Sequence, residues 1–163
     1  MNKLVVSLVV LMFLLYMRYN LKYSEEYEIL QIKPSKLRPE LLRELNPIIV
    51  ERGTETTTDI VRKALKYMYI YTRRQSYPKL EGKLVKNNAR YAIIETKDDE
   101  TTDLEIVNPK YNKTPEDYRS VVVRLKRKQI AILPMFWRFG SNKPIECTYV
   151  HDVFSSTYQA LSR

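Results

Sequence analysis

Two residues near the C-terminus could together form a nucleophile. Cys147 and His151 lie four positions apart, and a β-strand would place both side chains on one face because strand residues alternate sides. A thiol beside an imidazole is the arrangement of a Cys–His nucleophile. The alternative, which we favour, is a small buried cysteine and a turn histidine that is hydrogen-bonded to the backbone.

The single histidine excludes several kinds of metal site. A two-histidine, one-carboxylate iron site needs two imidazoles, and a C2H2 zinc finger needs two cysteines and two histidines. The pair His151-Asp152 is similar to the HD pair of metal phosphohydrolases, whose sites need further histidines. The chain has no GxGxxG motif and no P-loop. We therefore expect no metal, no cofactor and no small-molecule substrate.

The formal net charge of +9 makes nucleic acid or an anionic membrane surface a possible partner. The densest basic cluster is Arg124, Lys126, Arg127 and Lys128, which lies between two apolar runs. This placement predicts a solvated hairpin tip. The alternative is a contact patch for phosphates or for an acidic protein.

Alternating and β-branched segments predict the strands that would position these residues. The expected strands are 28–33, 47–51, 67–72, 91–96, 104–107, 120–125, 129–136 and 145–154. We expect 120–125 and 129–136 to form the strongest hairpin of the chain. Pro134 predicts an edge or a bulge in its second strand, because proline lacks the N–H group.

Three helices are expected beside these strands. Pro39 suits the first turn of a helix over 40–45, the segment 59–68 is amphipathic, and 155–163 could close as a short helix. We read 97–103 and 140–144 as turns and 109–117 as a loop. Strands separated by turns and preceded by helices predict an α+β, mainly antiparallel domain, such as a sandwich or barrel, and not a doubly wound fold.

The N-terminus carries fourteen residues without a charge, Leu4 to Met17, with Lys3 before them and Arg18 after them. Such a run needs an apolar environment. A cleaved signal peptide is one explanation, but no small-residue cleavage site follows. A buried core helix is another, because the run is shorter than the about 20 residues that usually span a bilayer. We favour an uncleaved single-span membrane anchor. Its residues are Leu4, Val5, Val6, Leu8, Val9, Val10, Leu11, Met12, Phe13, Leu14, Leu15 and Tyr16.

The charges beside the anchor favour a cytosolic domain. Arg18 and Lys22 outnumber Lys3 among basic side chains, which places the C-terminal side in the cytosol. The single cysteine, Cys147, agrees because it allows no intramolecular disulfide. We therefore expect residues 1–23 to form the anchor and its exit, and residues 24–163 to form one domain.

Two blocks of the sequence carry a family resemblance. The first is EYEILQIKPSKLRPELLRELNPIIVERG, residues 26–53, and the second is VVVRLKRKQIAILPMFWRFGSNKPIECTYVHDVFSS, residues 121–156. Together they resemble the cupin-like, JmjC-related proteins of large double-stranded DNA viruses. Residues 47–50 (PIIV) are similar to the "PVVI"-type strand of those domains, and residues 132–137 (ILPMFW) to their "IPP-x-WWH"-type strand.

The resemblance implies a degenerate cupin or jelly-roll fold without its metal. Arg138, Phe139 and Gly140 stand where active enzymes carry an iron-binding histidine, and the HxD/E ligand pair is missing. In these viruses, metal-free jelly rolls with a hydrophobic N-terminus resemble minor capsid or virion membrane proteins. The resemblance thus implies a location between the inner membrane and the capsid shell.

We therefore predict a non-enzymatic, membrane-anchored minor capsid component. It would contact major or minor capsid proteins through tyrosines and basic turns, with its domain on the cytosolic, capsid-facing side. One alternative is a JmjC or cupin-type oxygenase, against which the single histidine counts. The other is a membrane-tethered nucleic-acid-binding protein, although a domain between membrane and shell would not meet the packaged genome.

Overall fold

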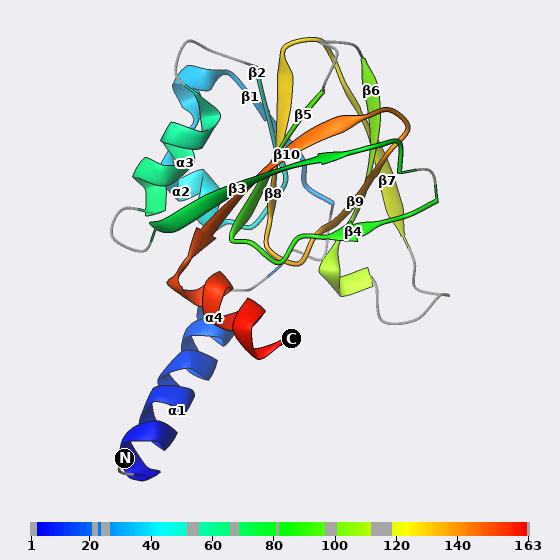
Figure 1. Ribbon diagram of the computed structural model, residues 1–163. Helices are drawn as coiled ribbons and strands as arrows, with labels where there is room; N and C mark the ends of the chain where they lie inside the picture. Colours follow the sequence, from blue (N-terminus) through cyan, green and yellow to red (C-terminus); the bar gives the residue numbers. More distant parts are fainter. Residues whose placement is uncertain are drawn as a thin grey trace.

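The computed structural model describes residues 3–20, 23, 27–51, 56–65, 69–80, 82–96, 101–111 and 119–162. In these ranges, two β-sheets face each other, short helices cover one of them, and helix α1 (Lys3–Asn20) projects from the body of the molecule (Figure 1). Residues 66–68, 97–100 and 112–118, which carry parts of the predicted helix, turn and loop, lie outside the described residues.

The larger sheet contains six strands and the smaller sheet four. The order in the larger sheet is β1 (Leu30–Ile32), β2 (Ile48–Glu51), β8 (Gln129–Pro134), β5 (Tyr91–Thr96), β10 (Ile145–Asp152) and β3 (Tyr69–Tyr77). The order in the smaller sheet is β4 (Val85–Lys86), β9 (Arg138–Ser141), β6 (Thr102–Val107) and β7 (Ser120–Leu125). All these pairings are antiparallel except that of β1 with β2.

The strands from β3 to β10 follow the connectivity of a jelly roll. One face has the order β3-β10-β5-β8 and the other has β4-β9-β6-β7, which is the arrangement of two Greek keys folded into a double sheet. Strands β2 and β1 extend the first face beyond β8. The prediction of a mainly antiparallel β fold with few helices is confirmed.

The larger sheet is buried on both faces, which explains its long apolar runs. Ala92, Ile94 and Leu133 point between the two sheets, together with Trp137 and Phe139 of the neighbouring segment. The alternate residues of the same strands pack on the other face beneath short helices. Those residues are Ile48, Val50, Tyr91, Ile93, Ile130, Ile132 and Val150.

The helices begin where the sequence provides capping groups. Pro39 occupies the first turn of α2 (Pro39–Arg43), as predicted. Asp152 caps α4 (Val153–Leu161) by accepting from the Ser155 backbone N–H at 2.7 Å, and the Ser155 side chain accepts in return from the Asp152 N–H. The remaining helical elements are α3 (Thr57–Leu65) and the 3-10 turns η1 (Pro34–Lys36) and η3 (Pro109–Tyr111).

The predicted hairpin of 120–125 and 129–136 is wrong, although both strands exist. β7 pairs with β6 in the smaller sheet, whereas β8 pairs with β2 and β5 in the larger one. The basic turn between them therefore passes from one sheet to the other. The burial patterns give the reason, because β7 alternates on an open edge while every residue of β8 is buried.

Other local predictions also need correction. Pro134 ends β8, a central strand, where it is paired with Tyr91 of β5 and lies beyond the last rung with β2. β6 begins at Thr102, inside the predicted turn, and β9 occupies Arg138–Ser141, where a turn was expected from Gly140. β3 continues to Tyr77, and the two-residue strand β4 was not predicted.

The segment that follows α1 is fastened to the sandwich by two tyrosines. The Tyr23 hydroxyl donates to the Met135 carbonyl oxygen at 2.8 Å. The Tyr27 hydroxyl accepts from the Asn108 N–H at 3.1 Å and donates to the Arg119 carbonyl oxygen. Both rings pack against the core between the sheets. The chain thus enters the jelly roll through specific contacts before β1 begins.

Candidate ligand pocket and apolar helix

Strand β10 presents the two residues that could do chemistry on its inner face. Cys147 and Tyr149 belong to the core between the sheets, and Val150 belongs to the core on the opposite face. His151 follows with the same alternation and is 3% exposed. The prediction that Cys147 and His151 share one face of a strand is confirmed.

The environment of Cys147 does not suit a nucleophile. Its side chain is fully buried, and burial raises the pKa of its thiol to about 12, with the Tyr149 hydrogen bond opposing that rise. Nucleophilic cysteines need a lowered pKa because the thiolate is the reactive form. The favoured prediction of a buried, structural cysteine is confirmed.

His151 is buried but is not the backbone-bonded turn histidine that we expected. It lies in β10, its ring stacks on the Tyr71 ring with centroids 4.5 Å apart, and its Nδ1 has no hydrogen-bond partner among the described residues. Burial lowers the pKa of His151, the nearby Arg73 guanidinium lowers it further, and Asp152 opposes this. The imidazole is therefore held in its neutral form.

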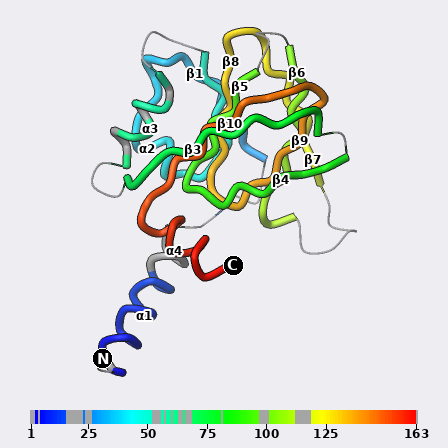
Figure 2. Tube along the Cα trace, in the orientation of Figure 1, coloured from blue at the N-terminus to red at the C-terminus, as the bar shows by residue number. Residues whose placement is uncertain are grey.

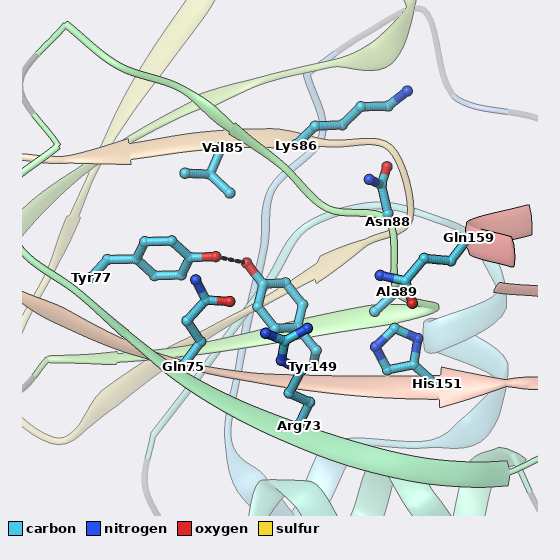
Figure 3. Close-up of a pocket in the computed structure, with 10 residues that line it drawn as sticks. All are labelled: Arg73, Gln75, Tyr77, Val85, Lys86, Asn88, Ala89, Tyr149, His151 and Gln159. Atoms are coloured by element: carbon cyan, nitrogen blue, oxygen red, sulfur yellow. Dashed lines mark hydrogen bonds between the residues drawn. The ribbon is translucent and has the colours of Figure 1, made fainter. Parts of the chain in front are cut away.

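His151 lines a cavity of about 140 Å³ at one end of the jelly roll (Figure 3). Arg73, Gln75 and Tyr77 of β3 form one wall. The other lining residues come from β4 and the segment after it, from β10 and from α4: they are Val85, Lys86, Asn88, Ala89, Tyr149 and Gln159. Among the described residues, the lining includes two cations, Arg73 and Lys86, and several neutral polar groups, and no acidic residue.

The inner wall is closed by a pair of tyrosines. The hydroxyl oxygens of Tyr77 and Tyr149 lie 2.6 Å apart, as the dashed line in Figure 3 marks. Burial raises the pKa of both phenols, so both are protonated at neutral pH. The Tyr77 ring also meets the Phe139 ring edge to face, with centroids 6.0 Å apart. This pair separates the cavity from the apolar core.

Asn87 positions the segment that carries Lys86 and Asn88. Its buried Nδ2 donates to the carbonyl oxygens of Leu133 and Pro134 at 3.0 and 2.9 Å, and its Oδ1 accepts from the Ala89 N–H at 2.9 Å. These bonds tie the segment between β4 and β5 to the end of β8. The neighbouring Asn88 faces the cavity instead, and its buried Oδ1 has no hydrogen-bond partner among the described residues.

The Lys86 ammonium lies near two aromatic rings at the cavity rim. Its Nζ is 4.8 Å from the centroid of the Phe136 ring and 5.9 Å from that of Tyr158. Phe136 holds its place through a left-handed backbone conformation, with φ of 69°, and an N–H bond of 2.7 Å to the Asn87 carbonyl oxygen. Aromatic faces attract a cation without using its N–H donors.

The predicted basic patch is exposed, and its Arg124 is paired with an acidic residue. Arg124 lies on β7, and its Nε donates to Asp103 Oδ1 at 2.8 Å. This bond holds the pKa of the Asp103 carboxyl below its usual value. Lys126, Arg127 and Lys128 lie at the crossing between the two sheets. The patch is therefore a connection between layers and not a hairpin tip.

Helix α1 exposes apolar side chains along the described part of its surface. The large apolar residues are between 39% and 65% exposed: they are Val5, Val6, Leu8, Val9, Val10, Leu11, Met12, Leu14 and Leu15. Phe13 is half-buried, because its ring stacks on Phe154 of α4 with centroids 6.0 Å apart and an interplanar angle of 26°. Figure 2 shows α1 leaving the molecule beside α4.

Two further observations concern the parts of the chain that the structure describes. Within them, no helix combines the length and the apolar character that crossing a membrane requires. Within the same ranges, no group of three or more His, Cys, Asp or Glu side chains could hold a metal ion. The side chains of Leu4 and Tyr16, two of the predicted anchor residues, lie outside the described side chains.

The fold and the site define a jelly-roll β-sandwich that carries a polar cavity and an apolar helix. No protein-family model matches the chain, and no curated protein matches it. Among solved structures, it is similar to dTDP-4-dehydrorhamnose 3,5-epimerase from Bacillus anthracis str. Ames, with TDP and PPi bound, at a TM-score of 0.37 and 10% identity. The match covers 61% of this chain and 62% of that chain, and a likeness at this level carries no argument about activity.

Proposed function

We propose that this protein is a non-enzymatic structural component of a large double-stranded DNA virus, tethered through α1 to the inner viral membrane. The observation that carries the proposal is the exposed apolar surface of α1. From Val5 to Leu15, the large apolar side chains other than Phe13 are exposed. A helix that is apolar all round belongs in a membrane or in an apolar protein interior, because burying each such side chain contributes roughly 1.5–3 kcal/mol.

The charges at the ends of α1 support a membrane as the apolar partner. Lys3 precedes the apolar stretch and Arg18 follows it. Long basic side chains can keep their charge in water while their stems lie along apolar surface. The Phe13–Phe154 contact links α1 to α4 of the jelly roll, and we place that domain on the cytosolic, capsid-facing side.

The jelly roll is the part that we assign to contacts with other capsid proteins. The resemblance of residues 26–53 and 121–156 to the cupin-like proteins of these viruses supports this assignment, as does the jelly-roll strand order. The exposed turn with Lys126, Arg127 and Lys128 is suited to an acidic protein surface. We propose that the domain is a degenerate cupin that works by position and not by catalysis.

A pair of matched substitutions tests the tether. Val9→Glu places a charge on α1, where Val9 is 61% exposed, and Val122→Glu makes the same change on β7, where Val122 is 64% exposed. The unchanged chain and the Val122→Glu variant should stay with membranes that are washed with alkaline carbonate. Val9→Glu should move to the soluble fraction. If the unchanged chain is soluble, or if both variants behave alike, the tether is wrong.

The virion location needs a separate test. Chemical cross-linking of purified virions, followed by mass spectrometry, should join lysines of this protein to capsid proteins. Lys126 and Lys128 are the first candidates because both are exposed. Absence of the protein from purified virions would refute the capsid role and leave the membrane test unaffected.

A further inference from the structure

Helix α4 lies at the end of the jelly roll from which α1 projects (Figure 1), and it contains no charged residue. Its polar Ser155 is fully buried, whereas Val153 and Leu161 are 48% and 76% exposed. Thr157 and Ala160 are also exposed. The four exposed residues have the spacing of one helix face, which in a surface helix normally carries the apolar residues inward. Here that face points outward, so we expect it to contact something other than water.

The contact with α1 fixes the level of α4 along that helix. Phe13 stacks on Phe154 with ring centroids 6.0 Å apart. The uncharged run of α1 continues to Met17, four residues beyond Phe13. At a helical rise of about 1.5 Å per residue, Phe13 therefore lies about 6 Å inside that end of the run.

This depth corresponds to the boundary between lipid headgroups and acyl chains. When the uncharged run of α1 lies in the hydrocarbon region, as the proposed function requires, α4 is held at the edge of that region. Helices that lie in the plane of a membrane bury their apolar face by roughly 5–10 Å at the same boundary. The level set by the Phe13–Phe154 contact thus agrees with a second membrane contact through α4.

The charges around α4 also suit a lipid surface. Asp152, which caps the helix, is 1% exposed, so its carboxylate is not presented to the outside. The exposed Lys86 lies beside α4, with its Nζ 5.9 Å from the centroid of the Tyr158 ring. Basic side chains at this level are attracted to an anionic membrane surface.

We propose that α4 is an interfacial helix, which lies in the headgroup region of the membrane that holds α1 and turns Val153 and Leu161 toward the acyl chains. The proposal rests on the proposed tether, because α1 sets the depth of α4. It adds a direct contact between the jelly roll and lipid, which fixes the end of the domain that faces the membrane. The basic turn at 126–128, yellow in Figures 1 and 2, lies at the opposite end, where a capsid protein could reach it.

Nitroxide labels at three exposed sites test this arrangement in the full-length protein, reconstituted into vesicles of phosphatidylcholine and phosphatidylserine. The sites are Leu161→Cys on α4, Val9→Cys on α1 and Val122→Cys on β7, all of them more than half exposed in the unchanged chain. Each is combined with Cys147→Ala, so that the chain has one thiol, and the fold is checked by thermal melting. Relaxation of each label by oxygen, which concentrates in lipid, and by a water-soluble nickel chelate measures its depth.

We expect oxygen to dominate for the Val9 and Leu161 labels, with the Leu161 label the shallower, and the chelate to dominate for the Val122 label. A Val9 label in lipid and a Leu161 label in water would overturn the placement of α4 and leave the tether intact. The exposed face of α4 would then be open to a protein partner instead. A Val9 label in water would refute the tether and the placement of α4 together.

A matched pair of charges shows whether the apolar face of α4 holds it in the membrane. Val153→Asp adds a charge to that face in the first turn, where an acidic side chain suits the helix dipole. It should move the Leu161 label into water and leave the Val9 label in lipid. Val122→Asp, the same change on β7, should move neither label. A Leu161 label that stays in lipid in the Val153→Asp variant would overturn the proposal.

Discussion

Helix α1 and the interior of the jelly roll both depart from the usual distribution of side chains. Helix α1 exposes apolar side chains, whereas the jelly roll buries polar ones. α1 carries exposed valines and leucines on its surface, with Met12 65% exposed. The jelly roll buries Asn87, His151 and Asp152, none of which is more than 3% exposed. Soluble domains ordinarily place apolar groups inside and polar groups outside. Each inversion therefore marks a place where something other than water is expected.

The two inversions differ in how well the protein itself satisfies them. Asn87 has hydrogen-bond partners supplied by the fold, and Asp152 accepts through Oδ1 from the Ser155 N–H, with its Oδ2 3.9 Å from the Arg90 Nε. His151 Nδ1 and the apolar side chains of α1 lack such partners among the described residues, apart from the Phe13–Phe154 contact. A buried polar group with a partner helps to build the fold, whereas an apolar helix surface left exposed indicates an apolar partner outside the domain. The comparison thus separates features that build the fold from features that serve a function.

The largest expected effect concerns how completely the protein interior excludes water from Cys147. At pH 8, a pKa of about 12 leaves roughly one Cys147 thiol in ten thousand ionised, about a thousandfold less than in the unfolded chain with its pKa of 9.0. Alkylation by iodoacetamide should therefore be slow in native buffer and fast in urea. The chain has one cysteine, so the stoichiometry by mass spectrometry is unambiguous. Rapid native alkylation would show that the inner face is open.

Two neighbouring asparagines test whether bonded and unbonded polar groups differ as we argue. Asn87→Leu removes three hydrogen bonds and leaves their buried partners unpaired. The free energy of unfolding should therefore fall by about 3 kcal/mol or more. Asn88→Leu removes a buried oxygen that has no hydrogen-bond partner among the described residues, so stability should stay the same or rise by up to about 1–3 kcal/mol. Urea denaturation measures both. Similar losses of unfolding free energy in the two variants would contradict the distinction between bonded and unbonded polar groups.

The pH dependence of stability tests the buried imidazole. Burial and Arg73 lower the pKa of His151 below 6.5, its value in an unfolded chain. Between the two pKa values, the unfolded state binds the proton and the folded state does not. Stability therefore falls as the pH decreases from about 6.5 to the folded-state pKa, and this contribution levels off below it. Midpoints of urea denaturation between pH 7.5 and 5 measure the slope, and His151→Gln should reduce it. An unchanged slope in that variant would contradict the burial argument.

The smallest effect concerns the joint between α1 and the jelly roll. Phe13→Ala, Phe154→Ala and the double variant form a mutant cycle across the one described ring contact between α1 and α4. The expected coupling is about 0.5–1.5 kcal/mol in thermal unfolding. A coupling near zero would show that α1 moves independently of the domain, which would sharpen the contrast between the two regions.

The strands with the clearest patterns were predictable from the sequence. The predicted bounds of β5, 91–96, agree with the structure, and the predicted ends of β1, β2 and β10 lie within two residues of the observed ends. The alternating or β-branched residues of these segments predict strands. The pairing of β7 was not predictable, because a short polar turn suits a hairpin and a sheet-to-sheet crossing equally well. β4 has two residues and β9 contains a glycine, so neither has a strand-like pattern.

The cavity was missed because its residues look like solvent-facing positions of a strand. In β3, Arg73 is exposed and Gln75 is half-buried, and the residues on either side of each are exposed, as on any polar strand. Only the register with β10 places Arg73 opposite Tyr149 and Gln75 opposite Cys147, on the inner face. The sequence does show an alternation in β3, formed by Tyr71, Arg73, Gln75 and Tyr77. These residues can be assigned to the inner face only when the pairing of β3 with β10 is known. The apolar helix, in contrast, needs no partner strand to be recognised.

The way the chain leaves α1 also has a mechanical consequence. A force that pulls α1 away from the body acts first on the Phe13–Phe154 contact, then on the hydrogen bonds of Tyr23 and Tyr27, and then on the three rungs between β1 and β2. These rungs link parallel strands, so the strain spreads over several bonds at once before it reaches β8. The joint would therefore yield in stages, in which the ring contact and the tyrosine bonds break before the three rungs, and the rungs share the load before it reaches the central strands.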